Sequence, residues 1–346
     1  MLTPESNRAP LVSICIPTFN RAGLIGDAIV SALGQSYSRI EVLVVDNAST
    51  DNTEGVVAAF SDPRLKYIRN EKNLGLFGNF NRCIEVASGD LIHILHSDDT
   101  IDKDFTGTCV VFFQQNPDVY LTFGSAKVLL DNRIVTEIRY SDTDVVLRPP
   151  DGFRRLLAER NFIVCPSVMV RKELYDVLGR YPADLPYSAD YAFWLKVARM
   201  YSLGYVRDAV IYYRQGEHSE SYRLLFSSPD GYIDMLRIYL STIRDLGDQY
   251  ASYGEEMNKA LWRYAKDCMY AAATRSRRGR EDSGAVPSMY AGAAISGWSM
   301  IRPTSMLGIG KKYLQILGIV AFAVLVAIPG VKQLLRRHLN KSGACY

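Results

Sequence analysis

The sequence predicts an α/β protein with a mostly parallel central sheet. Short apolar runs end abruptly at polar residues, and segments with helical apolar spacing lie between them. Strands that are separated by helices require crossover connections, and these favour parallel pairing. The chain has 346 residues, of which 48% are hydrophobic and 22% are charged. That balance is typical of a folded globular protein and excludes a disordered or collagen-like chain.

The first half of the chain alternates strand and helix. Continuous apolar runs predict buried strands at Leu11–Pro17, Ile40–Val45, Leu65–Ile68 and Leu91–Leu95. Helical spacing of apolar residues predicts helices over 24–33 and 80–87. Between them, Asp51 and Glu54 resemble a capping box, which predicts a helix that runs to residue 60.

The second half mixes its elements. Apolar runs over 120–130 and 134–139 flank Asp131-Asn132, which predicts a hairpin. A helix is expected over 189–201 and a strand over 205–213. At about 150 residues per domain the length predicts about two domains. We expect a catalytic domain at 1–226, a helical region at 227–300 and a separate apolar segment at 301–346.

Polar residues follow three of the predicted strands. They form the clusters 17–20 (PTFN), 46–49 (DNAS) and 97–99 (SDD). Each cluster alone could be an ordinary turn or helix cap. Because ligands of open α/β sheets bind beyond the carboxyl ends of the strands, three clusters at one edge favour a ligand cleft.

Asp98 and Asp99 form the cluster with the most chemical character. Adjacent carboxylates repel each other unless a cation lies nearby, and Mg²⁺ or Mn²⁺ takes such ligands together with substrate phosphates. The alternative is a helix cap for a segment that starts near Ile101. Asp46 could accept hydrogen bonds from a ribose or a base. The glycine patterns of dinucleotide folds and of P-loops are absent after the first strand.

Four segments in this order carry a resemblance to a known family. Residues 12–21 (VSICIPTFNR), 41–53 (EVLVVDNASTDNT), 73–75 (NLG) and 97–99 (SDD) are similar to the family 2 glycosyltransferases. The resemblance is strong over about 11–100 and continues more weakly to about 221. It implies an inverting enzyme that uses nucleotide-sugar donors. It also implies the GT-A fold, a Rossmann-like nucleotide-binding sandwich, followed here by a C-terminal helical region.

The resemblance also implies roles for residues at the carboxyl edge. Those matching the nucleotide-binding positions of the family are Pro17, Thr18, Phe19, Asp46, Asn73, Gly75 and Asp98. In the family the aromatic residue packs against the base. The second acid of the pair, Asp99, would contact the metal, and Asp98 would lie near the ribose or donor sugar.

Two further segments resemble family motifs on the acceptor and diphosphate sides. Residues 187–195 (YSADYAFWL) make Asp190 the candidate general base, although many members carry Glu-Asp where this chain has Ala189-Asp190. Asp190 could also cap the helix that follows. Residues 214–221 (RQGEHSES) suggest Arg214 as a diphosphate contact and His218 as a metal or phosphate contact. An exposed loop histidine is the alternative for His218.

The predicted function is metal-dependent transfer of a sugar, with inversion, from a UDP-sugar to a hydroxyl acceptor. The acceptor would be a lipid-linked or cell-surface polysaccharide precursor, and the metal Mn²⁺ or Mg²⁺. Donors based on dTDP and GDP stay open. A nucleotidyltransferase and a non-catalytic sugar-nucleotide-binding protein are the alternatives. The first usually has a glycine-rich phosphate loop, and the second would lack the acids that this chain retains.

The C-terminal residues suggest where the enzyme works. After Asp282 no acid occurs in 64 residues, and the stretch carries seven Lys and Arg residues around the uncharged run Ile316–Ile328. Thirteen residues are short for a membrane span, but flanking bases suit a segment that dips into an anionic surface. A packed or dimerising helix is the alternative. We expect a cytoplasmic protein, peripheral or monotopic on the inner face of the membrane, without a secretory signal or nucleic-acid partner. Six cysteines without CxxC spacing predict reduced thiols.

Overall fold

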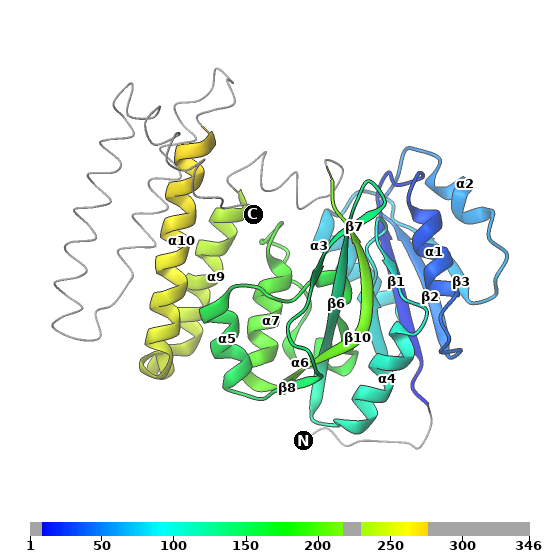
Figure 1. The fold of residues 1–346 in the computed structure, drawn as a ribbon. Coiled ribbons are helices and arrows are strands. Elements are labelled where there is room, and N and C mark those ends of the chain that lie inside the picture. Colours follow the sequence, from blue (N-terminus) through cyan, green and yellow to red (C-terminus); the bar gives the residue numbers. More distant parts are fainter. Residues whose placement is uncertain (1–8, 217–229, 276–346) are drawn as a thin grey trace. The chain divides into compact units, whose positions relative to one another are not determined.

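The computed structural model describes residues 9–216 and 230–275 (Figure 1). The chain divides into two compact units, Met1–Gly231 and Tyr232–Tyr346. The first unit contains the sheet. Its strands are β1 Val12–Thr18, β2 Ile40–Asp46, β3 Leu65–Arg69, β4 Leu91–Ile94, β5 Thr100–Ile101, β6 Val119–Leu130, β7 Arg133–Ile138, β8 Val145–Leu147, β9 Met169–Arg171 and β10 Ser202–Arg214. Its helices are α1 Ile25–Leu33, α2 Thr53–Ala58, α3 Leu76–Val86, α4 Phe105–Gln115, α5 Asp151–Glu159, η1 Cys165–Ser167, α6 Glu173–Leu178 and α7 Ala189–Met200.

The sheet has the strand order β3-β2-β1-β4-β9-β6-β10-β5, with β7 on β6 and β8 on β10. The first four strands in this order pair in parallel, as do β6 and β10. The short strand β9 is antiparallel to both β4 and β6, so these two run in the same direction. The long strands that support the site are therefore parallel, as the sequence predicted.

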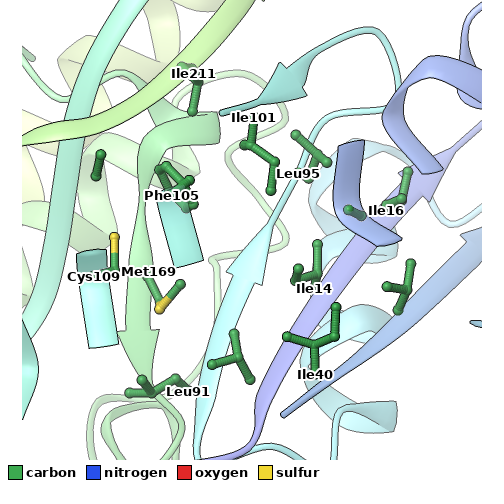
Figure 2. Close-up of a cluster of buried hydrophobic side chains, with 14 of the residues drawn as sticks. Ile14, Ile16, Ile40, Leu91, Leu95, Ile101, Phe105, Cys109, Met169 and Ile211 are labelled. Atoms are coloured by element: carbon green, nitrogen blue, oxygen red, sulfur yellow. The ribbon is translucent and has the colours of Figure 1, made fainter. Parts of the chain in front are cut away.

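The central strands are buried on both faces because helices cover both. All seven residues of β1 are buried. Successive strand side chains point to opposite faces. Ile14 and Ile16 lie in the apolar cluster that includes Ile25 of α1 and Phe105 of α4 (Figure 2). Between them, the Cys15 thiol donates a hydrogen bond to the Cys83 carbonyl of α3 on the other face. This arrangement explains why the strands read as continuous apolar runs.

The predicted strands and the hairpin are confirmed, with ends that differ by up to three residues; the largest difference is at β10, which begins at Ser202 instead of residue 205. Asp131 and Asn132 make the turn between β6 and β7, both with positive φ. The helix predicted from residue 80 begins four residues earlier, at Leu76. The capping box is wrong in detail, because α2 has no side-chain cap bond at its N-cap. Instead, the Asp51 carboxylate accepts the Thr53 N–H and reaches across to the N–H of Ala22.

The second unit contains helices α9 Asp230–Leu246 and α10 Gly254–Arg275, joined by η2 Gly247–Tyr253. Tyr239 and Tyr264 make an edge-to-face ring contact at 6.0 Å. These helices confirm the predicted C-terminal helical region within the described residues. The basic, acid-free stretch lies outside them. In the described ranges, no helix has the length and hydropathy that a membrane crossing requires.

Candidate active site

The carboxyl ends of β1, β2 and β3 lie side by side and form the first part of the site. The strand register pairs Thr18 with Asp46, and Asp46 with Arg69. Strand β4 lies on the other side of β1 and leads into the loop that carries Asp98 and Asp99. The three polar clusters therefore lie at one edge of the sheet. This convergence follows from the parallel strand order, which a single strand's sequence does not specify.

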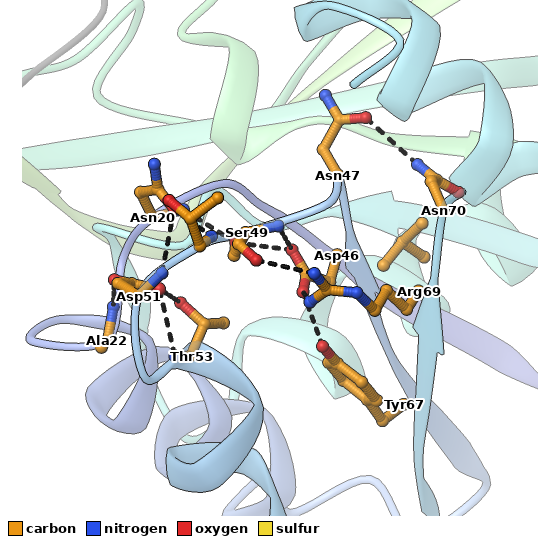
Figure 3. A network of polar contacts seen from close by, with 12 residues as sticks. Asn20, Ala22, Asp46, Asn47, Ser49, Asp51, Thr53, Tyr67, Arg69 and Asn70 are labelled. Atoms are coloured by element: carbon orange, nitrogen blue, oxygen red, sulfur yellow. Dashed lines mark hydrogen bonds and ion pairs between the residues drawn. The ribbon is translucent and has the colours of Figure 1, made fainter. Parts of the chain in front are cut away.

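Asp46 is fully buried, and its carboxylate accepts four hydrogen bonds from the protein (Figure 3). Oδ1 accepts from the backbone N–H and the hydroxyl of Ser49, at 2.9 and 2.6 Å. Oδ2 accepts from the Tyr67 hydroxyl at 2.6 Å and from the Arg69 guanidinium at 2.8 Å. Asp46 thus organises the loop after β2 from beneath. Its predicted contact with the nucleotide stays a prediction.

A second set of bonds joins the loop after β1 to the loop after β2 (Figure 3). The N–H of Asn20 donates to the Ser49 hydroxyl, and its Oδ1 accepts the N–H of Thr50 at 2.7 Å. Asn20 has a φ of +53° and Ala48 has a φ of +63°. Asparagine tolerates this region, but a residue with a Cβ such as alanine adopts it at a cost. The tertiary hydrogen bonds hold both turns in this conformation.

Asparagines fix the loop that follows β3. Asn47 donates to Asn73 Oδ1 at 2.9 Å, and its own Oδ1 accepts from the Leu74 N–H and from Asn70. Asn70 donates also to Asn79, which donates in turn to the backbone of β2. Asn47, Asn70 and Asn79 are all buried. Because buried amides need partners, this ladder locks the Asn73 loop to the end of β2.

The predicted base-binding residues combine buried and exposed side chains. Pro17 and Thr18 are buried, and the Thr18 hydroxyl oxygen has no hydrogen-bond partner among the described residues. Phe19 is 41% exposed, as is Leu74. Gly75 has a φ of +77°, so glycine suits the turn into α3. An exposed aromatic ring beside polar groups is suited to stacking on a planar ring.

The loop after β4 brings together His96, Asp98 and Asp99, whose ligand atoms lie within 4.8 Å of one another. Asp99 is buried, and its Oδ1 accepts the backbone N–H of Arg214 at 2.7 Å. Burial and the adjacent Asp98 carboxylate raise the pKa of Asp99 well above its ordinary value. A divalent cation would reverse this shift, since it stabilises the carboxylate form. The residues therefore fit a divalent cation.

Arg214, at the end of β10, crosses over this loop. Its guanidinium donates to the Asp98 carbonyl at 3.0 Å and to the Asp27 carboxylate of α1 at 3.1 Å. The predicted diphosphate contact thus lies directly beside the acidic pair. His218, the other prediction from this segment, lies outside the described residues.

Asp190 begins α7 and is half-buried. Burial raises its pKa to about 6, against opposing hydrogen bonds from backbone N–H groups and from the Asn161 side chain. Burial also raises the pKa of the Cys165 thiol, and the charges of Asp190 and Asp99 raise it further.

Sequence reasoning missed several residues of this site. Tyr67 and Arg69 lie on β3 with period-two spacing, which could have suggested that both reach the end of β2. Asn47 directly follows Asp46, but nothing in the neighbouring sequence indicates its hydrogen bonds to Asn70, Asn73 and Leu74. Asn161 is isolated in sequence from Asp190. His96 stands three residues before Asp99, and this spacing was the available signal.

Comparisons with known proteins agree with this geometry. A family profile described as Glycosyl transferase family 2 matches residues 13–179. The UDP-Glc:alpha-D-GlcNAc-diphosphoundecaprenol beta-1,3-glucosyltransferase WfgD of Escherichia coli is 29% identical over 189 residues. The match covers 55% of this chain and 70% of that protein. This chain also matches relatives from Mycobacterium tuberculosis and Haemophilus influenzae. Those matches cover 62% and 65% of the relatives' own lengths, which is less than two thirds.

Solved structures share the fold. S. aureus TarS 1–349 in complex with UDP-GlcNAc superposes with a TM-score of 0.65 at 21% identity, covering 83% of this chain and 81% of that one. A mannosyltransferase from Pyrobaculum calidifontis in complex with GDP-Man and Mn²⁺ superposes with a TM-score of 0.52 at 19% identity. That alignment covers 93% of this chain and 88% of the other. The fold is therefore of the GT-A type.

Proposed function

Because the chain belongs to family 2 of the glycosyltransferases, we propose that it transfers a sugar from a UDP-sugar to a hydroxyl acceptor, with inversion. The observation that carries the proposal is the convergence of two groups on one sheet edge. A hydrogen-bonded loop scaffold lies at β1 to β3, and an acidic pair, of which Asp99 is buried, follows β4. The first suits a nucleotide and the second suits a cation that binds its phosphates.

The nucleotide is proposed to lie across the loops after β1, β2 and β3. Phe19 is exposed beside the Asp46 network and offers its ring to the base. The Thr18 hydroxyl has no hydrogen-bond partner among the described residues, so it could bond a polar atom at the edge of the base. Asp46 holds the loop after β2 through its bonds to Ser49, Tyr67 and Arg69, and its contact with the base or ribose is part of the proposal. The uracil preference is supported by the TarS complexes, which contain UDP and UDP-GlcNAc.

Asp99, with Asp98, would hold the divalent cation, Mn²⁺ or Mg²⁺. When bound, such a cation neutralises charge that develops on the leaving diphosphate. Arg214 is positioned to share this task, since its guanidinium lies at the acidic pair. To do so it would exchange its bond to the exposed Asp27 carboxylate for a bond to phosphate, which is a charge-assisted bond of similar kind.

Asp190 is proposed as the general base that accepts the proton of the acceptor hydroxyl. Its pKa of about 6 leaves it deprotonated at neutral pH and a stronger base than an ordinary aspartate. Asn161 donates to the same carboxylate and would orient it. A single acid suffices for this step, so Ala189 at the neighbouring position does not weaken the assignment.

The acceptor is proposed to be a lipid-linked or cell-surface glycan precursor, reached from the cytoplasmic face of the membrane. The E. coli relative is named for a diphosphoundecaprenol acceptor, and the acid-free C-terminal stretch with its flanking bases suits an anionic surface. Flotation of the full chain with anionic and neutral vesicles tests this. Equal partition into both kinds of vesicle, or into neither, contradicts the proposed membrane association.

A thermal-shift panel of UDP, GDP and dTDP with Mn²⁺ tests the donor, followed by a donor-hydrolysis assay. We expect the largest stabilisation with UDP and slow release of UDP from a UDP-sugar. Release of pyrophosphate from a nucleoside triphosphate and sugar phosphate would indicate a nucleotidyltransferase instead. Nucleotide binding without hydrolysis, and without transfer to any hydroxyl acceptor offered, would indicate a non-catalytic sugar-nucleotide-binding protein.

A further inference from the structure

His96 lies in the loop after β4, where its imidazole faces the acidic pair. Its Nδ1 is 3.6 Å from Asp99 Oδ2. This separation is too long for a good hydrogen bond. It does fit two ligands of one cation, because bonds of about 2.1 Å to each atom place neighbouring ligand atoms about 3 to 4 Å apart.

One buried oxygen of this pair, Asp99 Oδ2, has no hydrogen-bond partner within residues 9–216 and 230–275. The Asp99 side chain is completely buried, and Nδ1 is the His96 atom that faces this oxygen. Because most buried polar atoms are paired, an unpaired carboxylate oxygen that faces an imidazole nitrogen indicates a place for a shared ligand. The Phe80 ring packs against the imidazole at 5.6 Å and limits its movement.

We propose that His96 is a nitrogen ligand of the divalent cation that Asp98 and Asp99 hold, an inference that rests on the metal-dependent function proposed above. A set of two carboxylates and one imidazole is softer than a set of oxygens alone. It favours Mn²⁺ or Co²⁺ over Mg²⁺, since imidazole suits transition metals and Mg²⁺ prefers oxygen. His96 thus sets which metal serves the reaction.

Pulsed EPR of bound Mn²⁺ tests the assignment without reference to turnover. The full chain is labelled with ¹⁵N-histidine and measured with Mn²⁺ and UDP. We expect a ¹⁵N coupling of a directly bound nitrogen in the wild type and in His218→Asn. In His96→Asp the coupling should be lost. No ¹⁵N coupling in the wild type would overturn the proposal, and so would a coupling that persists in His96→Asp but disappears in His218→Asn.

Metal preference provides a second measurement. Calorimetric titration of the UDP-bound protein should give at least about tenfold weaker Mn²⁺ binding for His96→Ala, because even outer-shell changes cost that much. His96→Asp should bind Mg²⁺ better than the wild type does. Unchanged Mn²⁺ affinity in a folded His96→Ala protein would contradict the role of His96. Failure of UDP itself to bind would count instead against the proposed function.

Discussion

The two halves of the site differ in how fully their polar groups are paired. Around Asp46 every carboxylate oxygen has two protein donors, and the asparagines above it bond to one another and to the backbone. At Asp99, Oδ2 has no hydrogen-bond partner among the described residues, and the pKa of the carboxyl group is raised. Paired groups stabilise the fold, whereas unpaired buried groups destabilise it and remain available to a ligand. We therefore expect the residues around Asp46 to stabilise the site and Asp99 to take part in the reaction.

The same substitution at both aspartates tests most directly whether Asp46 stabilises the fold and Asp99 serves the reaction. We expect Asp46→Asn to lower the free energy of unfolding by about 2–3 kcal/mol, because it weakens charge-assisted bonds to Arg69 and Ser49. Asp99→Asn should leave stability unchanged or higher, since it removes a buried charge. Its transfer rate should fall by at least about 10³-fold, the several kcal/mol that a metal supplies. Urea unfolding and a transfer assay measure both. An unstable Asp99→Asn protein with normal turnover would reverse the two roles.

Asp190 is the second carboxyl group of the candidate site with a raised pKa, so its substitution tests whether a raised pKa identifies a reacting group. Asp190→Asn should lower kcat by at least about 10²-fold with little change in UDP binding. The base must be deprotonated to act, so wild-type activity should fall as the pH drops below about 6. The residual activity of the variant should lack that acidic limb. A variant with normal kcat and weakened UDP binding would make Asp190 a binding residue.

Asn47 sharpens the comparison on the scaffold side. Asn47→Ala removes the acceptor of the Leu74 N–H and of the Asn70 amide, so we expect a loss of about 1–3 kcal/mol in unfolding free energy. The KM for the donor should rise, because the loop at Asn73 loosens. Asn52→Ala is the matched control, since Asn52 is exposed and makes no side-chain cap bond. Equal effects of the two variants would show that the ladder contributes nothing special.

The smallest expected effect is at Ala48, where the scaffold holds an alanine with φ at +63°. Ala48→Gly should raise the free energy of unfolding by about 0.5 kcal/mol, because glycine adopts this conformation without strain. Ala58→Gly, in helix α2, should lower it by about 1 kcal/mol. Thermal unfolding of the two variants resolves the difference in sign. Destabilisation by Ala48→Gly would mean that the alanine methyl group packs usefully.

The order of elements and the edge that carries the site could be predicted from the sequence. Continuous apolar runs identify β1, β2 and β4 because strands of a parallel sheet are buried on both faces. The polar residues that end these runs identify the edge. The helix α4 was not predicted, although its Phe105 and Cys109 are fully buried in the core. An apolar helix without strong periodicity looks like any other buried segment.

Local patterns were sufficient where neighbours in the sequence decide the structure. These include the turn at Asp131-Asn132, the buried strands and the acidic pair after β4. They were insufficient where distant segments meet. The sequence does not show that Tyr67 and Arg69 saturate Asp46, or that Glu41, inside an apolar strand, is paired by Ser13 and Ser88. Those hydrogen bonds depend on strand order and register. The tertiary structure alone therefore decided which carboxylate oxygens have protein donors and which, among the described residues, have none.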